Sequence, residues 1–111
     1  MARINYVELP AANIMAAKTF YSTVFGWSLT DFGPTYAATM TGDVDMGLQG
    51  DMAAATAHPL PVIDVDDLEA ALASVTKAGA RIAKPIFSFP GGRRFHFLDP
   101  NGNELAVVTA D

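Results

Sequence analysis

Short apolar segments alternate along the chain with stretches of helical periodicity. Residues 4–9 and 60–65 are mostly apolar and predict two strands, and a helical pattern follows each of them. Apolar residues recur at i, i+3 and i+4 spacing in the first pattern at Ile14, Ala17, Phe20, Tyr21, Val24 and Phe25, and in the second at Leu68, Ala71, Leu72 and Val75. Further strands are predicted at 27–32, 35–41 and 44–49, and at 80–83, 93–98 and 104–109.

Polar residues mark where both predicted helices begin. Asn13 is a capping residue for the first helix, and Asp66 or Asp67 is one for the second. Asp66 also fits a capping box with Glu69. A glycine in the C′ position stops each helical pattern, at Gly26 and Gly79.

The segment Asp99-Pro100-Asn101-Gly102-Asn103 predicts a tight turn between two strands. The proline presets φ, and the Asn-Gly pair supplies the positions with φ above zero. Apolar residues flank the segment on both sides, so a hairpin is expected here. Residues 85–90, with a proline at each end, predict an irregular edge or loop instead.

The two halves of the chain repeat one plan, a βαβββ module. The modules span about 1–50 and about 59–111 and form a single domain of 111 residues. We expect the α+β class, with a curved mixed sheet around a cavity. The helices lie on the outer face, because each has one apolar stripe to bury. Tyr21 and Trp27 are predicted to pack in the core between helix and strand.

Charge and composition exclude several classes of function. The chain carries twelve acidic and seven basic residues, a net charge of −5, and its one adjacent basic pair is Arg93-Arg94. Nucleic-acid binding is therefore not expected. The absence of cysteine excludes disulfides, thiolate zinc sites and a cysteine nucleophile. No segment approaches the roughly 20 apolar residues of a membrane span, so we expect a cytoplasmic protein with no membrane partner.

Five segments of the chain carry a resemblance to a known family. In chain order they read YVELPAAN, FYSTVFGW, VIDVDDLEAAL, KAGARI and FHFLDPNGNELAVV. Together they resemble the vicinal oxygen chelate superfamily, which includes glyoxalase I, bleomycin-resistance proteins and extradiol dioxygenases. The resemblance implies paired βαβββ modules, a small-molecule ligand and a homodimer.

In metal-dependent members of that superfamily four side chains bind one divalent ion, and the resemblance implies where they fall here. The first-strand histidine falls on Tyr6, the histidine that opens the second module on Leu60, and the last-strand glutamate on Ala106. The fourth position lies within 46–48, where the register is open and Asp45 is the one nearby carboxylate. Divalent metals need three or four histidine or carboxylate ligands. We therefore predict no metal site and no cofactor.

Strand alternation predicts which side chains line the cavity. Glu8 faces it from the first strand, while on the hairpin Arg94 and His96 face it and Phe95 and Phe97 face the helix. The whole predicted lining is Tyr6, Glu8, Tyr36, Met40, Leu60, Val62, Arg94, His96, Glu104 and Ala106.

Several of these residues have both a functional and a structural interpretation. Glu8 is a ligand contact or general base, or else a partner of Arg94 in an ion pair or an edge residue open to water. His96 is an acid/base group or hydrogen-bonds a ligand, or else fills space between two phenylalanines. Arg93 and Arg94 clamp an anionic group, or else solvate a strand edge.

Three functions follow from these alternatives. The first is a small-molecule-binding protein that lacks the usual metal ligands. The second is a lyase or isomerase-type enzyme that uses Glu8 and His96 as acid and base, or a relocated divalent-metal site of Glu8, His96 and Glu104. The third is a regulatory or vestigial dimer with no ligand of consequence.

Overall fold

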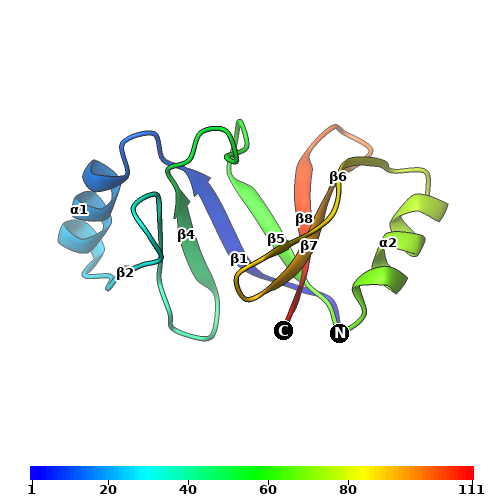
Figure 1. The fold of residues 1–111 in the computed structure, drawn as a ribbon, viewed down its shortest axis with the longest axis horizontal. Coiled ribbons are helices and arrows are strands. Elements are labelled where there is room, and N and C mark those ends of the chain that lie inside the picture. Colours follow the sequence, from blue (N-terminus) through cyan, green and yellow to red (C-terminus); the bar gives the residue numbers. More distant parts are fainter. The chain divides into compact units, whose positions relative to one another are not determined.

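The chain forms two compact units, which Figure 1 shows with their helices and strands. The computed structural model describes all residues, 1–111. The N-terminal unit is Tyr6–Leu60, and the C-terminal unit is Pro61–Asp111 together with Met1–Asn5. The elements in chain order are β1 (Arg3–Pro10), α1 (Ile14–Phe25), β2 (Thr30–Asp31), β3 (Tyr36–Ala38), β4 (Asp45–Gln49), β5 (Leu60–Asp64), α2 (Leu68–Lys77), β6 (Arg81–Phe89), β7 (Gly92–Leu98) and β8 (Glu104–Ala110).

Both units have the same strand order, in which the first strand lies beside the last. The order is β2-β3-β4-β1 in the N-terminal unit and β6-β7-β8-β5 in the C-terminal unit. The first strand of each module pairs with the last in parallel, β1 with β4 and β5 with β8. The other neighbours are antiparallel. This is the predicted βαβββ plan, and the α+β class with two such modules is confirmed.

Helix α1 begins and ends where the sequence predicts. The backbone N–H of Ala16 donates to the side chain of Asn13 over 3.0 Å, which satisfies one of the free donors of the first turn. Gly26 closes the helix with φ of 70°. One side of α1 packs on β4, where Ile14, Ala17 and Tyr21 contact a core that contains Ala11, Met46 and Leu48.

The rest of the apolar stripe on α1 is exposed, contrary to the prediction. The exposed fraction exceeds half for Phe20, Val24 and Phe25 and is 40% for Trp27, which was expected in the core. The predicted strand over 27–32 is reduced to β2, two residues long, so the sheet offers little surface to cover a wider stripe. Tyr21 and Trp27 stack instead on each other, with ring centroids 5.4 Å apart.

Helix α2 is capped by Asp67, whose side chain accepts from the N–H of Ala70 at 3.0 Å. The predicted capping box of Asp66 and Glu69 is wrong. Glu69 accepts a 2.7 Å hydrogen bond from Arg93 on β7 instead of reaching back to the helix start. The core under α2 contains Leu68, Phe95 and Val107, with Ala71, Leu72, Val75 and Phe97 packed against it. Neither helix is long and apolar enough to cross a membrane.

The predicted turn between β7 and β8 is confirmed. The carboxylate of Asp99 accepts from the backbone N–H groups of Asn101 and Asn103, at 2.8 and 2.9 Å, and from the Asn103 side chain. Of the expected Asn-Gly pair, only Gly102 has φ above zero, at 82°. The hydrogen bonds of the Asp99 carboxylate hold the rest of the turn in place, so Asn101 needs no left-handed conformation.

Residues 85–90 are not the predicted irregular loop, because most of them belong to β6. This strand runs from Arg81 to Phe89 along β7, with register shifts between Ile82 and Lys84 and between Lys84 and Phe87. Pro85 falls in the second shift. A proline is tolerated there because β6 is an edge strand and the ladder skips that position.

Candidate functional site

The N-terminal unit holds a partly buried chain of three polar side chains on one face of its sheet. Tyr6 and Glu8 come from β1, and Tyr36 comes from β3. The Tyr36 hydroxyl donates to Oε1 of Glu8 over 3.0 Å. The hydroxyls of Tyr6 and Tyr36 are 2.6 Å apart, and since Tyr36 gives its proton to Glu8, Tyr6 is the donor of that bond. A relay of hydrogen bonds therefore runs from Tyr6 through Tyr36 to Glu8.

Glu8 is the charged end of this relay and is only 2% exposed. A buried carboxylate needs hydrogen-bond donors, because water no longer solvates it. Burial is also the main reason that the pKa of Tyr36 lies far above its usual value, and the adjacent Glu8 charge adds to the shift. Tyr36 therefore keeps its proton and stays a donor to Glu8.

Gly47 on β4 gives the two tyrosines the space that they occupy. The β1–β4 register places Gly47 beside Glu8, and a Cβ at Gly47 would collide with the hydroxyl oxygens of both Tyr6 and Tyr36. Met46 and Leu48 point to the helix-side core, so Gly47 is the residue within 46–48 that faces the tyrosines. This settles the register that the sequence left open.

Asp45, at the start of β4, stabilises the connection between β3 and β4 through hydrogen bonds. Its carboxylate accepts from the hydroxyls of Thr39 and Thr41 and from the backbone N–H groups of Thr41 and Gly42, at 2.7 to 3.0 Å. Desolvation opposes the charged form, but these four hydrogen bonds outweigh it and hold the pKa of Asp45 below its usual value. Asp45 is thus occupied with its own loop.

The C-terminal unit brings His96 and Glu104 together. Nδ1 of His96 on β7 lies 2.6 Å from Oε2 of Glu104 on β8. His96 is fully buried, and no atom in the structure hydrogen-bonds its Nε2. The predicted alternation holds, because Phe95 and Phe97 pack on the side of α2. His96 therefore faces the opposite side of the sheet.

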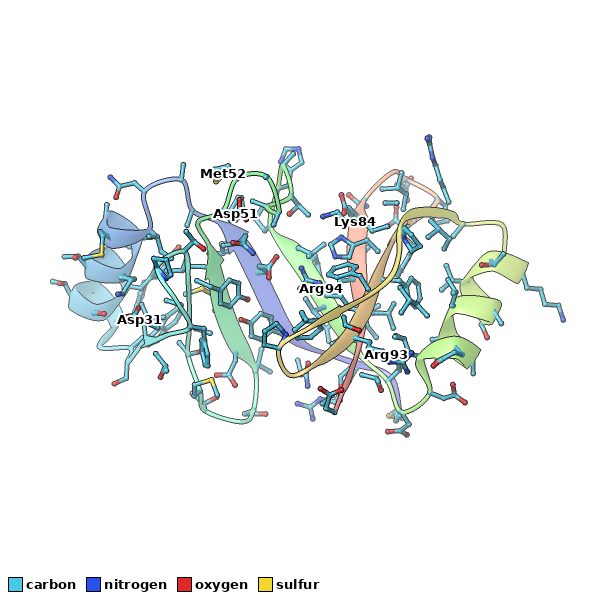
Figure 2. The ribbon with its side chains drawn as sticks, viewed as in Figure 1. Asp31, Asp51, Met52, Lys84, Arg93 and Arg94 are labelled. Atoms are coloured by element: carbon cyan, nitrogen blue, oxygen red, sulfur yellow. The ribbon has the colours of Figure 1, made fainter.

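Arg93 and Arg94 do not act as one clamp, because successive residues of β7 point to opposite faces. Arg93 pairs with Glu69 of α2, whereas Arg94 lies on the other face, as Figure 2 shows. The guanidinium of Arg94 stacks over the rings of Phe87 and Phe89, 5.3 and 5.6 Å from their centroids.

The other predicted lining residues have mixed positions. Val62 and Ala106 are buried and lie opposite each other in the β5–β8 register, and Ala106 also lies opposite His96. Leu60 is fully buried as well. Met40 lies beyond the end of β3 and is 66% exposed, so it is not part of the tyrosine relay.

The one described cavity lies elsewhere. It has a volume of about 600 Å³ and lies in the C-terminal unit, between the end of α2 and the β7–β8 turn. Its lining includes Val75, Phe97 and Pro100, and its two ionisable residues are Arg81 and Asp99. Asp99 is already bound within the turn, so this hollow offers little chemistry.

Comparison with known proteins identifies the family. The model of the Glyoxalase/Bleomycin resistance protein/Dioxygenase superfamily matches residues 3–107. The chain belongs to this superfamily. The putative glyoxylase CFP32 of Mycobacterium bovis is 30% identical to this superfamily member over 118 residues, which cover 96% of the chain and 45% of CFP32. The chain thus spans about half the length of that relative.

One further sequence relative and one solved structure match the chain. A glyoxylase-like domain-containing protein of Didymella fabae is 31% identical over 124 residues, covering 96% of this chain and 93% of its own length. The Mn(II)-bound glyoxalase of Novosphingobium aromaticivorans has a similar structure, with a TM-score of 0.70 over 98% of this chain and 40% of that one. At 22% identity, this second likeness supports the fold alone.

The residues at the positions that the resemblance assigns to a divalent ion are neither histidine nor carboxylate. Tyr6 holds one of these positions, and of the range 46–48 that was expected to hold another, Gly47 faces the tyrosines, whose hydroxyls fill the space beside it. The other two positions hold Leu60 and Ala106, both apolar and fully buried. Within each unit, no three histidine, aspartate or glutamate side chains gather around a common point.

Some residues of these two clusters could not be found from the sequence. Gly47 contributes to the tyrosine relay because it has no side chain where the two hydroxyls lie. This can be recognised only once the β1–β4 register is known. Phe87 and Phe89 fall in the segment that was expected to be irregular. The alternation of aromatic and small residues from 87 to 89 was the available signal for a strand there.

Proposed function

We propose that this chain binds a small organic molecule without a metal ion held by the protein. The observation that carries the proposal is the relay of Tyr6, Tyr36 and Glu8, whose hydroxyls occupy the space beside Gly47. A carboxylate and two phenol groups on one sheet face provide polar groups of fixed direction next to aromatic surface. This mixture is typical of small-molecule sites.

The relay defines what each of its members offers a ligand. Tyr36 is committed as a donor to Glu8, and Tyr6 is committed as a donor to Tyr36, so the relay holds its three polar groups in fixed directions. A ligand with O–H or N–H groups suits a site rich in phenol and carboxylate oxygens.

The direct test is the metal content of the purified protein, followed by thermal melts with Ni²⁺, Zn²⁺, Mn²⁺ and Fe²⁺. A ligand that binds only the folded state raises the melting temperature. We expect no stoichiometric metal and no metal-dependent shift. Bound metal with a clear shift would overturn the proposal and favour the alternative, an enzyme that uses Glu8 and His96 as acid and base or that relocates the metal to Glu8, His96 and Glu104.

The organic ligand is then sought by melts against a panel of neutral and cationic aromatic molecules. A compound that stabilises the natural chain is tested on Tyr36→Phe and on the matched variant Tyr21→Phe, which changes a tyrosine outside the relay. Loss of the shift in Tyr36→Phe alone supports recognition by the relay. An equal shift in both variants would place the binding site elsewhere.

We further propose that the chain forms a homodimer in the cytoplasm. The exposed aromatic side chains on and after α1 support the association, because exposed apolar surface is often covered by a partner. These residues are Phe20, Phe25, Trp27 and Phe32. Sedimentation of Phe25→Ser beside the natural chain tests the interface. A natural chain that is monomeric at micromolar concentration would exclude it.

A further inference from the structure

His96 has one ring nitrogen that the fold uses and one that it does not. Nδ1 lies 2.6 Å from the Glu104 carboxylate, while Nε2 is buried with no hydrogen-bond partner. Buried polar atoms are nearly always paired, since an unpaired one costs free energy that water would otherwise repay. An unpaired Nε2 on a fully buried ring therefore needs an explanation.

The position of Glu104 determines what Nε2 can do. A carboxylate only accepts hydrogen bonds, so the proton of the neutral ring lies on Nδ1, between the two groups. Nε2 then carries a lone pair and no hydrogen. The same arrangement of a carboxylate behind an imidazole holds the ring in one orientation and supports its action as a proton acceptor.

The surroundings of His96 are aromatic and mostly positive. Phe87 of β6 lies against the ring, with centroids 5.8 Å apart and planes tilted by 49°. Lys84 of β6 is opposite His96 in the β6–β7 register, and Arg94 is two residues away on the same face of β7. Apart from Glu104, the charged groups that act on His96 are thus cationic.

These neighbours favour the neutral form of the ring. Burial is the main cause that lowers the pKa of His96, and the charges of Arg94 and Lys84 lower it further, against the opposing effect of Glu104. Near neutral pH the ring is uncharged, and Nε2 keeps its lone pair unprotonated.

We propose that Nε2 of His96 accepts a hydrogen bond from a small, neutral, planar molecule with a weakly acidic O–H or N–H group, and that Glu104 is the positioning residue for this bond. The site belongs to the C-terminal unit alone and does not depend on the proposed role of the tyrosine relay. If the proton moves fully, the ligand becomes an anion and the ring an imidazolium paired with Glu104, so the total charge is unchanged.

The charge and shape of the surroundings select this class of molecule. A carboxylic acid is already ionised at neutral pH and has no proton to donate, and an ammonium group is repelled by Lys84 and Arg94. An aliphatic alcohol holds its proton too tightly to gain from nearby positive charge. A planar group can in addition lie against the ring of Phe87.

The test uses 4-nitrophenol as the probe, since its phenol and phenolate forms absorb at different wavelengths. The full chain is titrated with the probe at about one pH unit below the pKa of the free phenol. We expect the probe to bind as the neutral phenol with the red-shifted absorption of a hydrogen-bonded O–H, and 4-nitroanisole, which has no O–H, to bind at least about tenfold more weakly. Equal binding of the two compounds, or no binding of 4-nitrophenol at millimolar concentration, would overturn the proposal.

Three variants separate the roles of the residues. His96→Asn keeps an N–H near the position of Nδ1 for Glu104 but removes Nε2, so the red-shifted signal of the bound phenol is lost. Glu104→Gln keeps the imidazole but no longer fixes its tautomer, so the signal weakens and its pH profile shifts. His58→Asn changes the other histidine of the chain, which lies in an exposed loop, and leaves the signal unchanged. Equal signals in His96→Asn and His58→Asn would contradict the assignment.

A measurement on the natural chain tests the proposal even if one of the variants fails to fold. The chain has two histidines, so the ¹⁵N signals of His96 are assigned by comparison with His58→Asn. We expect Nε2 of the free protein to have the chemical shift of an unprotonated nitrogen and to move toward the protonated value when 4-nitrophenol binds. A protonated Nε2 in the free protein at neutral pH would refute the site. Metal analysis and Tyr36→Phe report on the tyrosine relay instead, so the two proposals fail independently.

Discussion

Tyr36 donates its single hydroxyl proton to the buried carboxylate of Glu8, over 3.0 Å. This bond joins β3 to β1, two strands that are separated by β4 in the sheet of the N-terminal unit. The contact therefore spans the strand between them, and it can do so because that strand has a glycine, Gly47, at the crossing point.

Replacing Tyr36 by phenylalanine removes the donor and leaves Glu8 buried with fewer partners. We expect the free energy of unfolding to fall by about 1–3 kcal/mol, since a buried charged acceptor loses a hydrogen bond. Tyr6→Phe is the matched control and should cost less, because it removes a bond between two neutral hydroxyls. Chemical denaturation measures both variants, and an equal or smaller effect of Tyr36→Phe would contradict the relay.

Alanine at Gly47 should destabilise the N-terminal unit because its Cβ needs the space that the Tyr6 and Tyr36 hydroxyls fill. We expect a loss of about 1–3 kcal/mol, as for other overpacked positions. In the background Tyr6→Phe/Tyr36→Phe the same substitution should cost less, because both obstructing oxygens are gone. The double-mutant cycle gives this coupling directly, and strict additivity would show that the hydroxyls do not compete with Cβ.

Asp45→Asn should loosen the β3–β4 connection. Four hydrogen bonds end on the carboxylate, and an amide replaces one of its two acceptor oxygens by a donor. We expect a loss of about 1–3 kcal/mol in unfolding free energy. Asp66→Asn, at a side chain that is 95% exposed, is the control and should change little. Similar losses in the two variants would point to net charge as the cause.

The pKa of His96 gives a defined dependence of stability on pH. In the folded chain this pKa is lowered from 6.5, so the unfolded state binds the proton first as the pH falls. The contribution of His96 to the free energy of unfolding is therefore complete above pH 6.5 and is lost progressively as the pH falls below it. Asp45 and Asp99 also have lowered pKa values, but their contribution is lost at more acidic pH, below the usual carboxylate value of 3.8.

Unfolding free energies measured between about pH 7 and 5 test this dependence, because that interval spans the usual pKa of a histidine. We expect His58→Asn to retain the slope and His96→Asn to flatten it. A natural chain with constant stability over this interval would show that His96 takes up its proton equally in both states.

Much of the fold could be predicted because local residues determine it. Asn13, Gly26 and Asp67 end or begin helices through bonds within one turn, and Asp99 organises its own hairpin. Alternation along β7 correctly separated His96 from its phenylalanine neighbours. Such features depend on residues a few positions apart, so the sequence displays them.

The two polar clusters depend on contacts between strands far apart in the chain. The hydroxyls of Tyr6 and Tyr36 meet only because both strands flank Gly47, and no local pattern displays that meeting. Glu104 and His96 were both expected to face the cavity, but their 2.6 Å contact requires the β7–β8 register. The exposed half of α1 was missed because the sequence gives no warning that β2 is so short.

The shared strand order of the two units also determines when each can begin to fold. Within its module the first strand pairs only with the last. Strand β1 therefore cannot pair until β4 has been made, and β5 cannot pair until β8 has been made, each about 40 residues later. On the ribosome, a first strand emerges long before its partner, while the intervening helix can already form. Closing this loop is therefore the slow event in each half, and a chain truncated before residue 104 leaves β5 without the neighbour that completes its module.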